Sequence, residues 1–451
     1  MSSGTTGPTA SSMRRVALTS LAGTSIEWFD FFLYGTAAAL VFPTVFFSEN
    51  MPPFVSLIAS FSTFAVGFLA RPIGGVVFGH FGDRVGRKSA LVTALVMMGV
   101  ATTLIGCLPT YVMIGAAAPV LLIVLRFVQG LAVGGQWGGA MLLVTENAPP
   151  EKRGYYGAFA QAGAPVGLIL ANLAFILVSE NLSQEDFMSW GWRIPFICSV
   201  ALIGLSLYVQ LRLEDTPAFR ELQAHAKSAA TRDGEVQTVV RKSPVLEVLA
   251  TYPKQIALAA GAFLAVQVTF YILVAFVVAY GSNQIGLGLS RTTMLSAVLI
   301  SSFVQIPVLF LAASYSDRHG RRGIYMLGAV FMAIWGFVLF PLIDTGSFLY
   351  IALAITIGQV FIGMMYGPQA AMLAELFATH VRYSGASLGY QSGAILGGAL
   401  APIIATALLA TYDSTIGISI YIAFACVLTL VSLYMLKETY QTDLRATPVE
   451  S

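Results

Sequence analysis

The sequence predicts an all-α membrane protein with twelve transmembrane helices in two pseudo-symmetric six-helix bundles. Three observations support this fold class: the composition, the number of apolar segments and an internal repeat. Of the 451 residues, 57% are hydrophobic and 10% are charged, and the mean hydropathy is +0.79. Soluble domains carry about 25% charged residues. The composition therefore excludes an ordinary soluble domain and favours a polytopic membrane protein.

Twelve apolar segments are each long enough to cross a bilayer, which requires about 20 mostly apolar residues in a helix. Helices are expected because backbone polar groups in lipid must be hydrogen-bonded within their own segment. The predicted spans cover residues 16–45, 54–80, 88–110, 116–146, 154–179, 192–213, 253–281, 293–315, 322–343, 348–376, 384–411 and 416–436.

One long polar stretch separates six spans from six. It predicts a cytoplasmic central loop at 214–252 that links an N-terminal bundle at 16–213 to a C-terminal bundle at 253–437. The polar ends of the sequence predict a disordered cytoplasmic tail at 1–15 and a second cytoplasmic tail at 438–451.

The distribution of Lys and Arg predicts the orientation. Of 24 such residues, Arg71 and Arg126 lie inside spans, and Arg193 and Arg291 lie near one face. The other 24 − 4 = 20 lie on the opposite side. The positive-inside rule makes that side cytoplasmic. We therefore expect a multi-pass protein of the plasma (inner) membrane with both termini in the cytoplasm.

Charge and cysteine content restrict the partners. The net charge of +2 gives no reason to expect a nucleic acid or an acidic partner. Cys107, Cys198 and Cys426 lie in apolar runs without metal-ligand spacing, so we expect small core residues rather than disulfides or a metal site. We expect a monomer in the lipid bilayer.

The two halves share a motif. D-R-x-G-R-K begins at Asp83 after the second span, and D-R-x-G-R-R begins at Asp317 after the eighth, an offset of 317 − 83 = 234. Glu146 and Glu375 are each followed seven residues later by an Arg, at an offset of 375 − 146 = 229. Two markers with nearly one offset indicate a parallel duplication, which is typical of transporters.

These motifs, with R-F-V-Q-G in the fourth span, resemble the major facilitator superfamily. The stretches "EWFDFFLYG", "ARPIGGVVFGHFGDRVGRK", "GGQWGGAMLLVTENAP", "SWGWRIPF", "YGPQAAMLAELF" and "VRYSGAS" are similar to its metabolite:H+ symporter family, in the shikimate-transporter-like branch. The resemblance extends from about residue 16 to 437. It implies a secondary active transporter that moves a small organic acid or zwitterionic metabolite by proton symport with alternating access. The proton gradient would be the driving force, without a cofactor.

Other functions are less favoured. The chain lacks H-E-x-x-H and G-x-S-x-G, so we do not expect an enzyme. "GAPVG" in the fifth span partly matches the Pro/Gly motif of antiporters. A drug/metabolite:proton antiporter is therefore the alternative. A sensor that does not transport is the third interpretation.

Four charged residues lie at bilayer depth: Glu27, Asp30, Arg71 and Arg126. Such charges are costly and mark pairs or functional sites. From the helical rise, Asp30 and Arg71 lie about 22 Å and about 18 Å from the cytoplasmic side, which is a similar depth. Glu27 and Asp30 share one helix face. We predict that both carboxylates take part in proton coupling. The alternative is a static ion pair between the first two spans.

Other polar groups in the spans predict substrate binding. A guanidinium group matches a carboxylate, although Arg71 and Arg126 could instead satisfy backbone carbonyls. Related symporters usually have Glu where this chain has Gln136, so either that position carries no proton or it mimics a protonated acid. Amides and hydroxyls suit substrate polar groups, with helix–helix bonding as the alternative. The predicted substrate-binding residues are Arg71, Arg126, Gln136, Tyr34, Gln267, Tyr271, Gln359, Gln369 and Tyr390.

The repeated motifs also predict a cytoplasmic gate, because their acids and bases can pair across the two bundles. The alternative is that the basic residues only set the topology. The predicted gate residues are Asp83, Arg84, Arg87, Glu146, Arg153, Asp317, Arg318, Arg321, Glu375 and Arg382.

Overall fold

The computed structural model confirms the predicted fold class. The described residues fold as helices joined by short turns, and they contain no strand. Nine helical segments among them are long and apolar enough to cross a membrane, and Val92–Cys107 is a shorter apolar helix. The described residues are 10–85, 87–134, 141–142, 144–146, 148–212, 250–283, 286–377 and 382–440.

The six predicted spans of the first half coincide with helices over their described residues, and the fourth, at 116–146, is described as a continuous helix only to Gly134. The first helix begins at Ala10 rather than at residue 16, because a helix can continue past the apolar segment into polar surroundings. The helices are α1 (Ala10–Leu40), α2 (Phe42–Val45), α3 (Pro53–Val85), α4 (Arg87–Cys107), α5 (Tyr111–Ile114), α6 (Ala117–Gly134), α8 (Arg153–Asn181), α9 (Gln184–Asp186) and α10 (Arg193–Arg212). A π-helical segment, Phe187–Gly191, lies between α9 and α10.

The second half repeats this pattern with three interrupted spans. π-Helical segments interrupt the seventh span at Ile272–Phe276 and the eleventh at Ala394–Ala399. The tenth span breaks at Gly367 and Pro368. The helices are α13 (Pro253–Tyr271), α14 (Val277–Ser282), α15 (Arg291–His319), α16 (Arg321–Ile343), α17 (Phe348–Tyr366), α18 (Gln369–Leu376), α19 (Arg382–Gly393), α20 (Ala401–Tyr412) and α21 (Ile416–Met435).

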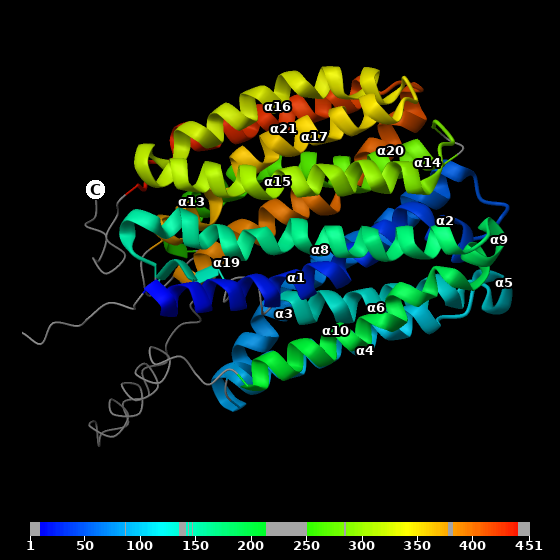
Figure 1. Ribbon diagram of the computed structural model, residues 1–451, viewed down its shortest axis with the longest axis horizontal. Helices are drawn as coiled ribbons and strands as arrows, with labels where there is room; N and C mark the ends of the chain where they lie inside the picture. Colours follow the sequence, from blue (N-terminus) through cyan, green and yellow to red (C-terminus); the bar gives the residue numbers. More distant parts are fainter. Residues whose placement is uncertain are drawn as a thin grey trace, which may run out of the picture.

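The packing of the helices follows the duplication. In the first half α1 packs on α8, α3 on α6 and α4 on α10. In the second half the corresponding pairs are α13 with α19, α15 with α17, and α16 with α21. Between the halves, α8 packs on α15, and α3 packs on the Ala394–Ala399 segment and α20. The halves therefore form two similar bundles that lie side by side (Figure 1).

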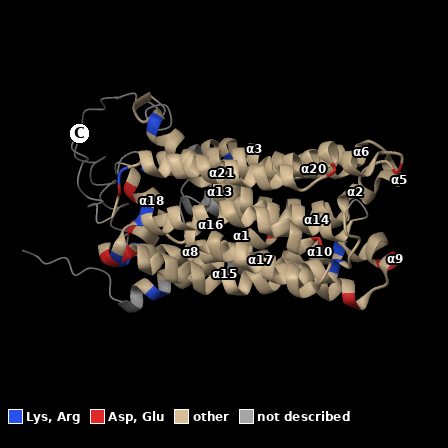
Figure 2. Ribbon diagram, turned by 90° about the horizontal axis from the view of Figure 1, so that it is seen from above, with Lys and Arg blue, Asp and Glu red and all other residues tan. Residues whose placement is uncertain are grey.

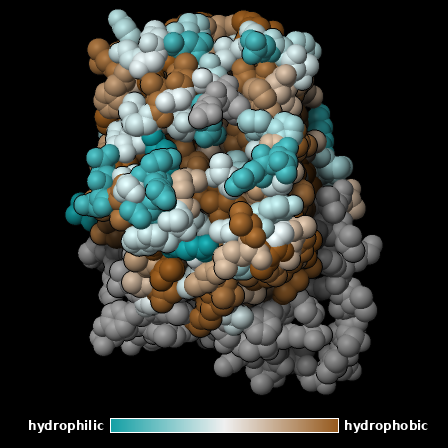
Figure 3. All heavy atoms as spheres, turned by 90° about the vertical axis from the view of Figure 1, so that its right-hand side faces the viewer, coloured by the Kyte–Doolittle hydropathy of each residue, from teal (hydrophilic) through white to brown (hydrophobic). Residues whose placement is uncertain are grey.

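Charged residues gather at the two ends of the molecule, and most of its length between them carries few (Figure 2). We call the end where α1 and α8 begin the predicted cytoplasmic end, and the end near α5 and α9 the predicted outer end. Figure 3 faces the predicted outer end, where hydrophilic residues gather on a surface that also carries many hydrophobic ones. This distribution suits a helical bundle that spans a bilayer.

Candidate functional site

A small cavity lies among α1, α3, α4 and α6, next to the boundary between the bundles. It has room for about one water molecule. Three of the four charged residues predicted at bilayer depth line it, on three different helices. The lining residues are Asp30, Phe31, Gly67, Arg71, Met98, Arg126, Gln129, Gly130 and Val133.

Arg126 reaches this cavity because α3 offers it space. Gly67 lies opposite, and a Cβ atom at Gly67 would be 2.5 Å from Nε of Arg126. The Arg126 side chain is buried, and its Nη1 donates to Oε1 of Gln129 at 3.1 Å. Its Nε and Nη2 have no hydrogen-bond partner among the described residues. Arg126 thus has donors available for an anionic group.

Aromatic rings hold both guanidinium groups. The Phe31 ring centroid lies 4.4 Å from Cζ of Arg71 and 4.6 Å from Cζ of Arg126. Arg71 also lies 4.6 Å from the Phe68 ring, and Arg126 lies 4.1 Å from the Tyr34 ring. Such cation–π contacts stabilise a desolvated cation. The sequence analysis missed Phe31 and Phe68, although the aromatic stretch around Asp30 was a signal that could have identified Phe31.

Asp30 is 1% exposed, and neither of its carboxylate oxygens has a hydrogen-bond partner among the described residues. The hydroxyl of Thr102 lies beside this carboxyl group. Asp30 and Arg71 line the same cavity, as their similar depth predicted, but the described residues contain no ion pair between them. Glu27 is partly buried, and the described residues contain no ion pair between it and Arg71 either. A static Asp30–Arg71 pair is therefore absent from this structure.

The C-terminal bundle contributes hydroxyl and amide groups to the same region. Tyr390 interacts with Arg71 and with Gln267. Tyr271 lies near Arg71 and Tyr390, and Tyr366 lies near both tyrosines. The structure thus brings together six predicted substrate-binding residues from two bundles, Arg126 and Tyr34 included, and it adds Tyr366.

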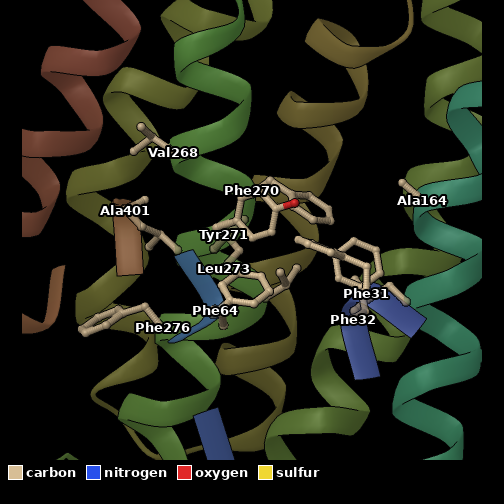
Figure 4. Close-up of a cluster of buried hydrophobic side chains, with 14 of the residues drawn as sticks. Phe31, Phe32, Phe64, Ala164, Val268, Phe270, Tyr271, Leu273, Phe276 and Ala401 are labelled. Atoms are coloured by element: carbon tan, nitrogen blue, oxygen red, sulfur yellow. The ribbon is translucent and has the colours of Figure 1, made fainter. Parts of the chain in front are cut away.

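Aromatic side chains close the boundary between the bundles around this site. Phe31 and Phe32 on α1 lie opposite Tyr271 and Phe270 on α13 (Figure 4). The ring centroids of Phe31 and Tyr271 are 6.1 Å apart, and those of Phe32 and Phe270 are 5.6 Å apart. A substrate large enough to contact both bundles would have to displace these rings.

Of the other predicted binding residues, Gln369 lies outside the site, and Tyr34 borders the site through its ring. Gln369 donates to the hydroxyl of Tyr325, which itself donates to the backbone oxygen of Ala262 at 2.6 Å. This arrangement is helix–helix bonding near the predicted cytoplasmic end. Tyr34 contacts Arg126 through its ring, while its hydroxyl donates to Thr63 at 2.7 Å.

Two predicted binding residues lack a defined partner or a description. Gln359 is fully buried, and its amide atoms have no partner in the part of the chain that the structure describes. Gln136 lies outside the described residues. Their predicted roles stay predictions.

The predicted gate lies at the predicted cytoplasmic end, and Asp317 is its centre. One Asp317 oxygen accepts from the backbone N of Gly154 at 2.7 Å and from Nη1 of Arg321 at 2.6 Å. The other accepts from the backbone N of Tyr155 at 2.8 Å. Because Gly154 and Tyr155 begin α8, the carboxylate of one bundle caps a helix of the other.

A second acid extends this contact. Glu375 accepts from Nε and Nη2 of Arg321 at 3.2 and 3.1 Å, and Nη1 of Arg153 lies 3.8 Å away across the boundary. Arg382 pairs with Glu146 of the other bundle at 3.0 Å. We call Arg153, Asp317, Arg321, Glu375 and the Arg382–Glu146 pair the cytoplasmic gate.

Arg318 does not join the gate. It is exposed and has no partner among the described residues, so its charge fits the alternative reading that it only sets topology. The side chains of Asp83, Arg84 and Arg87 lie outside the described residues.

The sequence analysis missed two gate contacts from the segment predicted as a tail at 438–451. Glu438 accepts from the backbone N of Arg321 at 2.9 Å, and Thr439 donates to Glu375 at 3.0 Å. The first residues of that segment are therefore docked on the gate. The polar composition of this segment predicted a tail, because hydropathy carries no information about specific hydrogen bonds.

The bundles also meet at the predicted outer end. Nη2 of Arg291 donates to Oε1 of Gln184 at 2.6 Å, and its Cζ lies 3.8 Å from the Phe187 ring centroid. We call these three residues the outer clamp. Asn283 adds a bond to the backbone oxygen of Ala39 at 3.3 Å. Contacts at both ends enclose the central site.

Comparisons with known proteins agree with the fold. A family model described as "Sugar (and other) transporter" matches residues 16–447. The chain is 42% identical to the inner membrane metabolite transport protein YhjE of Escherichia coli K12, with 96% of each chain covered. It is 38% identical to the shikimate transporter of the same strain, covering 94% of this chain and 95% of that protein.

A solved structure shows the same fold at low sequence identity. The proton:xylose symporter XylE, of the major facilitator superfamily, superposes with a TM-score of 0.73 at 17% identity. The match covers 96% of this chain and 98% of the XylE chain. At this identity the likeness supports the fold and carries no information about the substrate.

Proposed function

From the premise that this chain belongs to the sugar (and other) transporter family, within the major facilitator superfamily, we propose that it couples the movement of a small carboxylate-bearing metabolite to protons. The protein is a multi-pass membrane transporter and not an enzyme. In the proposal, the substrate and protons move in the same direction across the plasma membrane by alternating access. The proton gradient drives the process, and a monomer with both termini in the cytoplasm carries it out.

One observation carries the proposal: two buried guanidinium groups with open donors share a cavity with an unpaired carboxyl group. Nε and Nη2 of Arg71, like those of Arg126, have no partner among the described residues. A buried charge without a partner is costly. A substrate carboxylate has two oxygens that can accept from such planar donors, so its binding would satisfy them.

The other groups of the site suit the remainder of such a substrate. Tyr271, Tyr366 and Tyr390 supply phenolic hydroxyls, and Gln267 supplies an amide that can donate or accept. The relative named a shikimate transporter supports a carboxylate-bearing substrate, because shikimate is a carboxylic acid.

Asp30 is the proposed proton carrier, with Glu27 as a second candidate. A neutral Asp30 leaves both cations to the substrate, whereas a charged Asp30 competes for them. Proton binding and substrate binding would therefore favour each other, which is the requirement for symport. This reciprocity distinguishes the proposal from antiport, in which the proton and the substrate compete.

Uptake by the purified chain in proteoliposomes tests the proposal. Labelled shikimate and a panel of labelled organic acids and betaines would be offered with and without an inward proton gradient. We expect the gradient to increase accumulation of at least one carboxylate. Asp30→Asn should abolish that increase while exchange of internal for external substrate continues.

Two further variants supply a second test and a control. Glu27→Gln shows whether the second acid is needed, and Arg318→Gln is the control for a charge removed outside the site. Gradient-driven accumulation by Asp30→Asn would remove Asp30 from the mechanism. Faster uptake under an outward proton gradient would favour an antiporter.

A further inference from the structure

Two buried side chains connect the acid of the cavity to one of its arginines. Gln129 on α6 is 2% exposed, and Thr102 on α4 is fully buried. Oε1 of Gln129 accepts from Nη1 of Arg126 at 3.1 Å, and its Nε2 donates to Oγ1 of Thr102 at 2.7 Å. Thr102 donates to the backbone oxygen of Met98 at 2.9 Å and lies beside the Asp30 carboxyl group.

The hydrogens in this chain of contacts are fixed by chemistry. Arginine only donates, so the Gln129 oxygen must face Arg126 and its NH2 group must face Thr102. Thr102 gives its one hydroxyl proton to Met98 and accepts one N–H from Gln129, so one acceptor site remains on its oxygen. A neutral Asp30 can donate to that site, whereas a carboxylate cannot.

Loss of the proton from Asp30 would change these contacts. The carboxylate would need donors, and those nearby are the Thr102 hydroxyl and the open Nε and Nη2 of Arg126. Arg71 has the same open donors and also packs over Phe31, but it interacts with Tyr390 of the other bundle as well. The distance between Arg126 and Asp30 therefore depends on Gln129, which binds the Nη1 atom of Arg126.

We propose that Gln129 and Thr102 are positioning residues that hold Arg126 away from Asp30, so that the proton and the substrate occupy separate groups of one site. Gln129 anchors Arg126, and Thr102 anchors Gln129 and leaves an acceptor site beside Asp30, to which the neutral acid can donate. This inference rests on the proposed function, because it assumes that Asp30 exchanges a proton.

Other titratable groups around the cavity have to be considered in a test of pH dependence. Those on the first bundle lie on α1, α3 and α6, and those on the second lie on α13 and α19. Only the two arginines among them are cations. The groups are Glu27, Tyr34, Arg71, Arg126, Tyr271 and Tyr390.

Infrared difference spectroscopy of the full chain in lipid tests the inference without a known substrate. A change of pH should produce a carboxylic acid band that is absent in Asp30→Asn. In Gln129→Leu, Arg126 is free to pair with the Asp30 carboxylate, so the midpoint of this band should move down by about one pH unit or more. In Thr102→Val the frequency of the band should rise, because the neutral acid loses its acceptor. Thr102→Ser should restore the parent frequency.

The outcomes separate the two proposals. If the band is present in Asp30→Asn, Asp30 does not carry the proton and the proposed function fails at that residue. If Asp30 titrates but Gln129→Leu leaves its midpoint and Thr102→Val leaves its frequency unchanged, the positioning role is wrong while the proposed function stands. If Gln129→Leu does not fold, the Thr102→Val and Thr102→Ser pair decides the question, since Val and Ser differ little from Thr in size.

Discussion

Asp317 accepts two main-chain hydrogen bonds across the boundary at the predicted cytoplasmic end, and its replacement by asparagine tests the gate. The carboxylate accepts from the backbone N of Gly154 at 2.7 Å, that of Tyr155 at 2.8 Å and Nη1 of Arg321 at 2.6 Å. Asparagine keeps one oxygen and turns an NH2 group toward a donor. At least one hydrogen bond is lost, and the others lose their ionic character.

The size of the effect follows from these bonds. A hydrogen bond to a charged group contributes about 1.5–3 kcal/mol, and a neutral one contributes about 0.5–1.5 kcal/mol. The bonds to Gly154 and Tyr155 cross the boundary, so only they favour the closed gate directly. Asp317→Asn should therefore destabilise the closed gate by about 2 kcal/mol. This corresponds to about a 30-fold change in the ratio of closed to open molecules. Two contacts across the boundary remain, Arg153 with Glu375 and Arg382 with Glu146, so the gate is weakened rather than removed.

A cysteine at position 370 reports the opening. Ala370 is 1% exposed on α18 and faces Gly157 of α8, so separation of the bundles uncovers it. The three native cysteines would be replaced by alanine. If alkylation requires opening, its rate in Asp317→Asn should rise by about 30-fold. Substrate affinity should change little, because Asp317 lies far from the central cavity.

Arg318→Gln is the matched control, because it removes a charge from the next residue of α15, which is exposed. It should leave the alkylation rate at the parent value. An unchanged rate in Asp317→Asn, or an equal rise in Arg318→Gln, would refute the reasoning.

Three further variants extend this test. Arg291→Gln should weaken the outer clamp at Phe187. Under the proposed alternating access it should therefore slow the alkylation of the same cysteine probe several-fold. Gln369→Leu should lower the stability by about 1–3 kcal/mol, seen as a lower melting temperature with unchanged affinity, because its partner Tyr325 is buried. If the variant instead loses substrate affinity with unchanged stability, Gln369 is a substrate-binding residue. Tyr390→Phe should reduce affinity by about 3–10-fold in binding assays, since the ring stays while the hydroxyl beside Arg71 is removed.

The sequence predicted the spans because hydropathy and length are properties of continuous segments. The duplication also followed from the sequence, since the motifs at Asp83 and Asp317 recur at one offset. The interruptions at Ile272–Phe276 and Ala394–Ala399 did not follow, because a π-helical turn has the same apolar composition as an α-helical one.

The site was predicted in part for a similar reason. Helical rise gives the depth of Asp30 and Arg71, but the rotation of each helix and the side-chain rotamers decide the partners. Depth alone favoured a contact between these two residues, whereas packing places Arg71 over Phe31. Gln369 has the right chemistry for substrate, yet it faces Tyr325. Such choices depend on neighbouring helices that a single sequence does not specify.

The cap on α8 has a consequence for how the protein tolerates mutation. Its two donors are main-chain N–H groups of Gly154 and Tyr155, so a side-chain change at Tyr155 leaves both in place, whereas a Cβ atom at Gly154 would lie 2.8 Å from the Asp317 carboxylate. Proline alone removes a main-chain donor, and the first helical turn accepts it. The acceptor, by contrast, is the single carboxylate of Asp317. Random mutagenesis should therefore find changes that weaken this cap at Asp317 and at Gly154, whereas at Tyr155 only Tyr155→Pro, and not Tyr155→Ala, should weaken it.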